Sequence, residues 1–310
     1  MKWGVHIPHL GREVSGEVIA SFAQDVEAMD VHSVWVSDHV CWPAHIESKY
    51  PYTADGSFPA NSSIGWLEPI STLLFIAGCT TRVRLGTTVL ILPYRAPVVT
   101  AKQLATLDVV SNGRLILGAG VGWMAEEAEV LGMPWDNRGE RSDEQLAIFE
   151  QLFYQPEASF NGRYYKFPTV HFEPKPVQSK VPVWIGGSSP AAFARTAKFG
   201  TGFHAAFQPR DVLVEEWAAV RREAEKLGRD PDELTFSVRV YLDPAGAMDP
   251  ELAINGSAQQ MIDSVGKFAD IGVSHMLLDP VARGGVEARL GAIRNFMTDV
   301  APNAAGGIET

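Results

Sequence analysis

The chain has 310 residues and a formal net charge of −11, with 26 Lys and Arg against 37 Asp and Glu. This acidic balance argues against general binding of nucleic acid or of an anionic membrane surface. Its two cysteines, Cys41 and Cys79, do not suggest a disulfide framework or a zinc cluster, and no apolar run reaches the roughly 18 residues of a membrane span. We therefore expect a soluble, cytoplasmic protein.

Short apolar runs alternate with helical patterns from the beginning of the chain. The run from Trp3 to Ile7 predicts a strand, and Ser15 is the expected N-cap of the helix that follows. Pro97 suits the first turn of a later helix. Strands are expected over residues 3–7, 33–36, 84–87, 115–119, 182–185, 202–205, 233–240 and 275–278. Helices are expected over residues 16–29, 68–79, 97–110, 124–131, 139–153, 190–199, 211–227, 257–271 and 286–300.

Eight strands, most of them followed by a helix, favour a closed (β/α)₈ TIM barrel that residues 1–300 form as one domain. The alternative, a doubly wound sheet, would need a Gly-x-Gly-x-x-Gly turn after the first strand, and none is there. Residues 158–168 interrupt the alternation, because Asn161-Gly162 between β-prone residues predicts an inserted hairpin. Residues 301–310 are expected to form a loose tail.

A long polar segment, residues 41–65, follows the second predicted strand. At more than 20 residues it is too long for a plain connector and suits an active-site loop. We expect its aromatic residues to form the wall or lid of a substrate pocket. They are Trp42, Tyr50, Tyr52 and Phe58, with Trp66 just beyond them.

Polar and flexible residues follow several predicted strands, at the end of such barrels where ligands bind. After the second strand, His39 can exchange a proton near neutral pH, or it is a plain loop histidine with Asp38 as a turn acceptor. After the fifth strand, Gly186-Gly187-Ser188-Ser189 has the features of a phosphate cradle, because glycines admit a ligand to the backbone and a helix N-terminus offers unpaired N–H groups. The same residues also suit a tight turn in which Ser189 caps the helix.

Three glycines, Gly118, Gly120 and Gly122, follow the fourth strand. Their spacing is not that of a dinucleotide fingerprint, but they leave room for a flat or bulky group over the strand end. Trp123 can stack on such a group or pack in the core. Glu126 and Glu127 come next, in a first helical turn where acidic residues suit the helix dipole.

Further candidates are basic. Arg138 and Arg141 share a helix face and can meet a phosphate or the nearby acids. His6, His9 and His204 lie near the ends of the first and sixth strands and are candidate residues of the substrate pocket. They lack the H-x-H or carboxylate–histidine spacing of a metal site, so we predict no metal.

Several of these stretches together resemble the bacterial luciferase-like superfamily, and most closely its coenzyme F420 (deazaflavin)-dependent oxidoreductases. The resemblance covers most of the chain. It is carried by VWVSDH (34–39), LGTTV (85–89), PxRxP (93–97), AKQLATLD (101–108), SxGRLxLGxGxGW (111–123), GER (139–141) and WIGG (184–187).

The resemblance implies a (β/α)₈ barrel that binds F420 or FMN at its carboxyl face. It implies a non-proline cis peptide at Thr88-Val89 that supports the cofactor ring, and backbone at residues 186–189 that meets the cofactor phosphate. His39 matches a histidine at the reactive face of the ring. Relatives that oxidise sugar phosphates carry a catalytic glutamate in the region where this chain has Val121, which argues against that substrate class. The family is often dimeric through the helices that correspond to 68–79 and 97–110.

The expected function is that of an F420-dependent oxidoreductase, which transfers a hydride between the deazaflavin and a small organic substrate. His39 is the expected catalytic residue. One alternative is an FMNH₂-dependent monooxygenase that needs a partner flavin reductase, and another is a barrel that binds flavin without catalysis. The residues expected to bind the cofactor are Asp38, Thr88, Val89, Gly120, Gly122, Trp123, Gly186, Gly187, Ser188 and Ser189.

Overall fold

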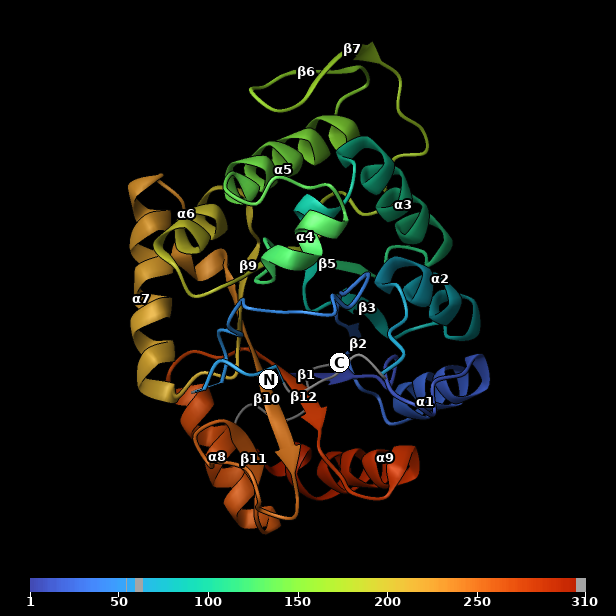
Figure 1. The fold of residues 1–310 in the computed structure, drawn as a ribbon. Coiled ribbons are helices and arrows are strands. Elements are labelled where there is room, and N and C mark those ends of the chain that lie inside the picture. The colour runs from blue at the N-terminus through green and yellow to red at the C-terminus, as the bar shows by residue number, and fades with distance from the viewer. Residues whose placement is uncertain (54, 59–63, 305–310) are drawn as a thin grey trace.

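Eight parallel strands close into a barrel in the computed structural model, which describes residues 1–53, 55–58 and 64–304. Helices surround the barrel (Figure 1). The expected (β/α)₈ fold is therefore confirmed, and the last strand pairs with the first. In the order of pairing, the strands are β1 (Lys2–His6), β2 (Ser33–Val36), β3 (Arg84–Thr87), β5 (Leu115–Gly120), β8 (Val183–Gly186), β9 (Gly202–Ala206), β10 (Thr235–Asp243) and β12 (His275–Pro280).

The helices begin and end close to the expected residues. Ser15 caps α1, since its Oγ accepts a hydrogen bond from the N–H of Val18 at 3.2 Å. Pro97 stands in the first turn of α3, as expected. The helices are α1 (Gly16–Ala28), α2 (Pro69–Cys79), α3 (Pro97–Val110), α4 (Ala125–Val130), α5 (Arg138–Tyr154), α6 (Pro190–Phe199), α7 (Arg210–Lys226), α8 (Ala258–Asp270) and α9 (Gly285–Asn295), and a π-helical turn (Phe296–Val300) extends α9.

The structure adds short strands that the sequence did not predict. They are β4 (Leu90–Ile91), which pairs with β5, and β11 (Ala253–Asn255), which pairs with β10. A strand of two or three residues is too short to show a periodic pattern in the sequence. The short 3-10 turn Leu92–Tyr94 follows β4.

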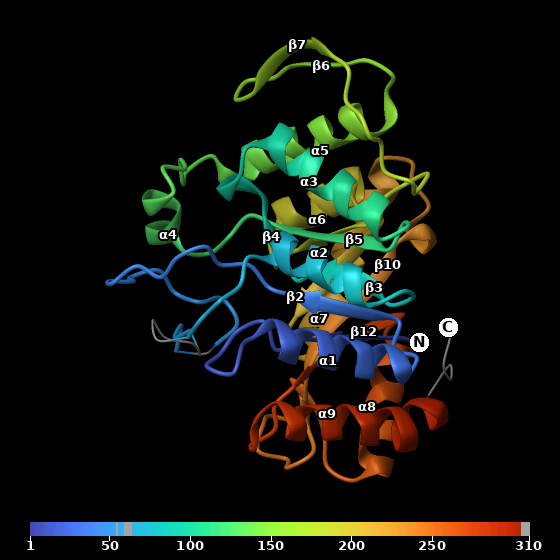
Figure 2. The same ribbon diagram turned by 90° about the vertical axis from the view of Figure 1, so that its right-hand side faces the viewer.

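The inserted hairpin is present as β6 (Ala158–Asn161) and β7 (Lys166–Val170). It projects from the barrel beyond α5 (Figure 2). Its turn differs from the expected Asn-Gly turn, because Asn161 pairs with Lys166 and residues 162–165 form the loop. The carboxylate of Glu144 accepts hydrogen bonds from backbone N–H groups of this loop, including that of Arg163, and so holds the wider turn in place.

The residues after the strands gather at one end of the barrel. Figure 2 shows β2 pointing toward the side where α4 and the loop after β2 lie, and both termini lie on the opposite side. We call these the carboxyl end and the amino end of the barrel. Parallel strands bring all their carboxyl ends to one face, so residues far apart in the sequence meet there.

Two indole rings lie in the barrel interior. The fully buried Trp35 stacks on Trp184, with ring centroids 5.2 Å apart. Gly86 makes room for this arrangement, because a Cβ there would lie 2.4 Å from the ring of Trp35. Between the strands and the helices, the core is made of aliphatic and aromatic residues such as Phe22 and Leu73.

The expected loose tail is wrong for residues 301–304. Ala301–Asn303 form a 3-10 turn, and Ala301 and Ala304 are buried in the core. Their small apolar side chains fill space beside the π-helical turn, so this part of the chain packs. Residues 305–310 of the expected tail lie outside the described residues.

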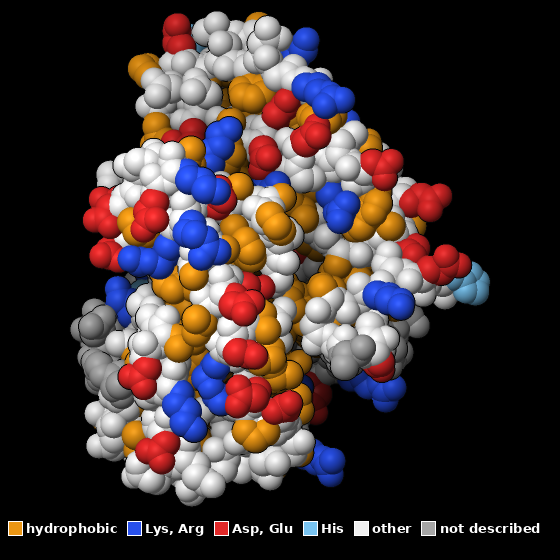
Figure 3. All heavy atoms as spheres, turned by 90° about the vertical axis from the view of Figure 1, so that its left-hand side faces the viewer, with side chains coloured by type: hydrophobic (Ala, Val, Ile, Leu, Met, Phe, Trp, Pro, Cys, Tyr) orange, Lys and Arg blue, Asp and Glu red, His pale blue; other side chains and the backbone are white. Residues whose placement is uncertain are grey.

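The surface carries both signs of charge. On the face shown in Figure 3, Lys and Arg side chains are interspersed with Asp and Glu. Within the part of the chain that the structure describes, no helix has the length and apolar character needed to cross a bilayer.

Candidate active site

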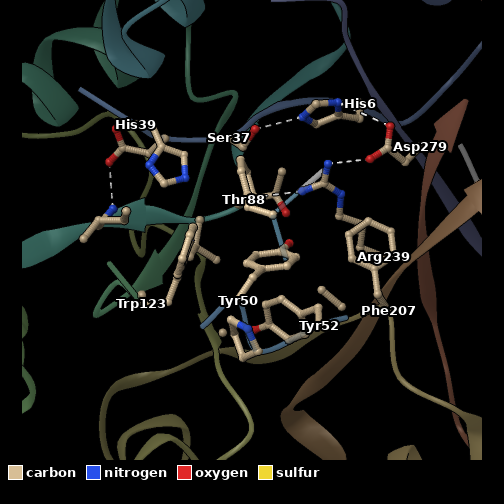
Figure 4. A pocket seen from close by; sticks show the side chains of 18 of the residues that line it. His6, Ser37, His39, Tyr50, Tyr52, Thr88, Trp123, Phe207, Arg239 and Asp279 are labelled. Carbon is tan, nitrogen blue, oxygen red and sulfur yellow. Dashed lines mark hydrogen bonds and ion pairs between the residues drawn. The ribbon is translucent and has the colours of Figure 1, made fainter. Parts of the chain in front are cut away.

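A cavity of about 750 Å³ opens at the carboxyl end of the barrel. This volume lies within the range of small-molecule sites. Residues at the ends of the barrel strands line it, together with residues of the loop after β2, such as Tyr50, Tyr52 and Phe58. Figure 4 shows lining side chains that converge on the cavity, among them Tyr50 and Tyr52. The described residues of segment 41–65 thus include part of the cavity wall, as expected.

His39 is held on this wall by a buried carboxylate. Its Nδ1 lies 2.7 Å from Oε2 of Glu127, and the side chain of Glu127 is fully buried. The other oxygen, Oε1, accepts the backbone N–H groups of Val40 at 2.6 Å and Cys41 at 3.2 Å. Burial by itself would raise the pKa of Glu127, but the hydrogen bonds from His39 and the two N–H groups lower it. Glu127 is therefore an anion that accepts the Nδ1–H proton of His39.

This pairing decides what His39 can do. Because Nδ1 donates to Glu127, the lone pair of the neutral ring is on Nε2. His39 lines the cavity, so Nε2 is the atom available to take a proton from a bound molecule or, once protonated, to give it back. Trp66 packs edge-on against the ring, with centroids 4.9 Å apart, and also lines the cavity.

Trp42 does not take its expected place in the pocket. It packs against His39, with centroids 5.7 Å apart, and against Phe58 at 5.3 Å, instead of lining the cavity. Trp42 therefore supports His39 and Phe58, which both line the cavity. Trp123 lines the cavity as expected and packs against Phe58.

Val89 lies between two glycines on the cavity floor. The peptide bond from Thr88 to Val89 is cis, as the resemblance implied. A Cβ on Gly120 would lie 2.4 Å from Cγ2 of Val89, and one on Gly186 would lie 2.9 Å from its Cγ1. Any side chain at either glycine would collide with Val89. The glycines of β5 and β8 therefore keep a smooth floor on which a flat group can rest.

The segment after β8 has features of both a tight turn that caps a helix and a phosphate cradle. Gly187 has φ +116°, which favours glycine, and Ser189 caps α6 by accepting the N–H of Ala192 at 3.2 Å. Oγ of Ser188 accepts a hydrogen bond from Gln208. Gly187 and both serines line the cavity, immediately before the N-terminus of α6.

Arg138 adds a cation to the cavity wall. Its guanidinium lies over the ring of Trp135, 3.7 Å from the centroid, and its buried Nε has no hydrogen-bond partner among the described residues. Arg141 does not join it, because its Nε donates to Asn137 and its guanidinium lies over Tyr164 of the hairpin loop. The guanidinium of Arg138, the hydroxyls of Ser188 and Ser189 and the backbone of Gly187 together form a donor set that fits a phosphate group.

A second polar group lies elsewhere on the wall, around Asp279 (Figure 4). Its carboxylate forms an ion pair with Arg239, and its Oδ1 lies 3.6 Å from Nδ1 of His6. Nε2 of His6 is hydrogen-bonded to Oγ of Ser37 at 3.2 Å. Burial and the nearby Arg239 lower the pKa of His6, so its ring is neutral. His6 thus lines the cavity, as expected, and lies beside Asp279.

His204 also lines the cavity floor, as expected. Its Nε2 lies 2.9 Å from Oγ1 of Thr88, which lines the floor as well. Burial lowers the pKa of His204 to about 3, so the ring is neutral.

Two expected site residues are buried in the scaffold. His9 has no exposed surface and does not line the cavity, since its ring binds backbone atoms of Ile7 and Ser37. Asp38 lines the cavity, but both carboxylate oxygens are hydrogen-bonded to Arg95, at 2.6 and 2.9 Å, and one also accepts the N–H of Ile91. Its carboxylate therefore holds Arg95 and the backbone of Ile91 at the cavity wall.

The sequence of residues 6–245 matches the profile of the luciferase-like monooxygenase family. The chain belongs to this family. The uncharacterized protein Rv0940c of Mycobacterium tuberculosis is 32% identical over 207 residues, which are 67% of the chain and 71% of that protein. The F420-dependent glucose-6-phosphate dehydrogenase of Amycolatopsis mediterranei is 31% identical over 189 residues, which are 60% of the chain and 52% of the dehydrogenase.

A likeness of fold to a solved structure extends over almost the whole chain. A solved structure of an F420-dependent secondary alcohol dehydrogenase, in complex with an F420-acetone adduct, superimposes with a TM-score of 0.80. The likeness covers 97% of the chain and 98% of the dehydrogenase at 17% identity, so it concerns the fold.

Some residues of this luciferase-like site were missed by the sequence analysis. Glu127 was interpreted as a partner of the helix dipole, and nothing in the sequence links it to His39. Arg239 and Asp279 were also missed, although a signal existed, because they are charged residues toward the carboxyl ends of predicted strands. Within residues 1–53, 55–58 and 64–304, no three His, Cys, Asp or Glu side chains are placed to hold a metal ion.

Proposed function

We propose that this protein is an F420-dependent oxidoreductase that transfers a hydride between the deazaflavin and a small organic molecule. The proposal is supported by its sequence relatives, among them F420-dependent glucose-6-phosphate dehydrogenases at 31% and 29% identity. The single observation that carries it is the cavity floor, where Val89 lies between Gly120 and Gly186 in the same cavity that His39 lines. That arrangement offers a flat surface beside a proton-exchanging group.

The residues present fit such a cofactor. The floor formed by Thr88, Val89 and Gly120 would carry the ring, and Gly187 to Ser189 with Arg138 would hold the phosphate. When bound, F420 supplies a carbon that accepts or donates a hydride. The protein's part is to fix that carbon and the substrate at reacting distance and to keep water out.

His39 would handle the proton that accompanies the hydride. Nε2 would take the proton of a substrate hydroxyl when the substrate is oxidised, and give it to a carbonyl oxygen in the reverse direction. Glu127 would stabilise the protonated ring, because its buried carboxylate accepts the Nδ1–H in either state. The direction of the reaction in the cell depends on the substrate.

The aromatic wall supports a small organic substrate. Tyr50, Tyr52, Phe207 and Trp66 give the cavity apolar surface, and burial raises the pKa of Tyr52 to about 12, so its hydroxyl stays protonated. Val121 lines the cavity in the region where sugar-phosphate-oxidising relatives are expected to carry a catalytic glutamate. The proposal therefore does not include glucose 6-phosphate as the substrate.

Titration of the purified protein with F420 and with FMN, followed by fluorescence, tests the cofactor. We expect F420 to bind at least tenfold more tightly. Tight FMN binding together with oxygen consumption that depends on FMNH₂ would instead favour a monooxygenase with a partner reductase. F420 binding without hydride transfer to any molecule of a broad alcohol and carbonyl panel would favour a non-catalytic barrel.

The proposal includes a homodimer through α2 and α3, with a small-molecule substrate and without nucleic-acid or membrane partners. The two helices expose Phe75 (48%), Val99 (59%) and Val110 (57%), and such residues suit an interface. Light scattering after size-exclusion chromatography should give twice the chain mass for the wild type and the chain mass for Phe75→Asp. A wild-type monomer would contradict the dimer.

A further inference from the structure

A continuous row of hydrogen bonds crosses the barrel interior from the cavity floor toward its amino end. At the cavity, Oγ1 of Thr88 lies 2.9 Å from Nε2 of His204. Nδ1 of His204 lies 2.8 Å from Oγ of Ser237, which lies 2.9 Å from Nδ1 of His275. These atoms come from β9, β10 and β12, where His204, Ser237 and His275 are direct neighbours in the strand register.

The row continues to the other end of the barrel. Nε2 of His275 lies 3.0 Å from Oγ of Ser33, which lies 3.2 Å from Nδ1 of His32. Ser33 and His275 are the first residues of their strands, and the partly exposed His32 lies just before β2. The row thus begins at the cavity and ends near the opposite surface. It occupies an interior that is usually filled by branched apolar residues.

Every group in this row can be satisfied in two ways. In one state, each member from Thr88 onward donates a proton to the next, and Ser33 donates to His32. In the other state, each hydrogen bond runs in the reverse direction, from His32 back to Thr88. Each serine donates once and accepts once in both states, and Ser33 can also accept the indole N–H of Trp35 at 2.8 Å. The two states differ by the passage of one proton.

The surroundings bury most of the row and keep its rings neutral. The indoles of Trp35 and Trp184 lie against His204 and His275, with Trp35 stacked on His204 at 5.1 Å. Burial lowers the pKa of His204 to about 3, that of His32 to about 4 and that of His275 well below its usual value. The charged groups that add to this are Arg239 near His204, and Lys2 and Arg84 near His32. A neutral ring can pass a proton on, whereas a stably charged ring would trap it.

We propose that this row is a proton pathway that links the cavity to the amino end of the barrel. A proton taken up at Thr88 moves each proton of the row by one position, and one proton leaves at His32. No electrons move, and the only bonds that change are O–H and N–H bonds. Its use in catalysis rests on the proposed function, because the proton that accompanies each hydride can travel to or from the cavity along this row. The alternative is a static network that only fills the barrel.

Nuclear magnetic resonance of the full-length protein, with ¹⁵N-labelled histidine, separates these two roles. A pathway interconverts the two states, so both ring nitrogens of His204 and His275 should show averaged ¹⁵N shifts. Ser237→Ala removes the central hydroxyl, and we expect each ring to freeze into one tautomer with well-separated shifts. Ser237→Thr keeps the hydroxyl and should keep the averaged shifts.

A second variant covers the case in which Ser237→Ala does not fold. His32 is only partly buried, so His32→Ala removes the outer end of the row with little risk to the fold, and it should freeze His275. A single fixed tautomer of both rings in the wild type would overturn the pathway. F420 titration of the same samples separates the proton pathway from the proposed cofactor. Failure to bind F420 would contradict the proposed cofactor, whereas the ¹⁵N shifts would still test the pathway.

Discussion

Nδ1 of His39 lies 2.7 Å from Oε2 of Glu127, and 88 residues of sequence separate the two. The pair places a histidine with a fixed tautomer on the wall of the cavity. We expect His39→Ala to slow hydride transfer by about 10²-fold or more, because the proton donor and acceptor is lost, while the Kd for F420 changes less. Stopped-flow absorbance of F420 measures the rate. His45→Ala, an exposed histidine of the same loop, is the control and should keep the wild-type rate.

Glu127→Gln tests whether the carboxylate works through His39. The amide cannot stabilise a protonated ring as an anion does, so we expect a loss of rate close to that of His39→Ala. Because the two residues act as a unit, the double variant should be no slower than His39→Ala alone. Glu126→Gln, on the same helix, should have no such effect. Multiplicative losses in the double variant would contradict the coupling.

The ion pair of Asp38 and Arg95 is expected to contribute to stability. The Asp38 side chain has no exposed surface and that of Arg95 is 13% exposed, so Asp38→Asn leaves a buried guanidinium poorly compensated. We expect unfolding free energy to fall by about 3–5 kcal/mol, measured by denaturant titration. Asp30→Asn removes the surface pair with Arg82, in which both side chains are about two-thirds exposed. It should cost less than about 1 kcal/mol.

The contact between Gly120 and Val89 can be tested by adding and removing methyl groups. Gly120→Ala places a Cβ against Cγ2 of Val89, and we expect a loss of about 1–3 kcal/mol in unfolding free energy. It should also weaken F420 binding, because Val89 must shift on the cavity floor. Adding Val89→Ala removes the collision and should restore part of both losses. If Gly120→Ala is as stable as the wild type, the floor is looser than described.

Stability should fall as the pH drops below about 6.5 because of buried neutral histidines. Burial lowers the pKa of His9 to about 4 and that of His204 to about 3, from 6.5. Between these values the unfolded chain binds more protons, so each histidine removes about 1.4 kcal/mol of unfolding free energy per pH unit. Denaturant titrations at pH 7.5, 6 and 5 measure the slope. His9→Gln should reduce the slope, and an unchanged slope would contradict the burial of His9 as a neutral ring.

Local patterns were sufficient to predict the barrel. Apolar runs and helical spacing are properties of neighbouring residues, so the eight strands and the caps at Ser15 and Ser189 were found from the sequence. The turn signals were weaker, because the loop of residues 162–165 depends on Glu144 from another element. The chain by itself also determined that the residues after each strand would share one end, since parallel strands leave no other choice.

The chemistry of the site was decided by contacts between distant elements. The sequence placed His39, Thr88 and Gly186 at the cavity. It could not show that the Asp38 carboxylate pairs with Arg95 or that His9 is buried, because both residues lie beside strand ends as pocket residues do. Glu127 gained its role only when the first turn of α4 met the loop after β2. The row from Thr88 to His32 likewise exists only in the closed barrel, where strand register brings single polar residues of separate strands within hydrogen-bond distance.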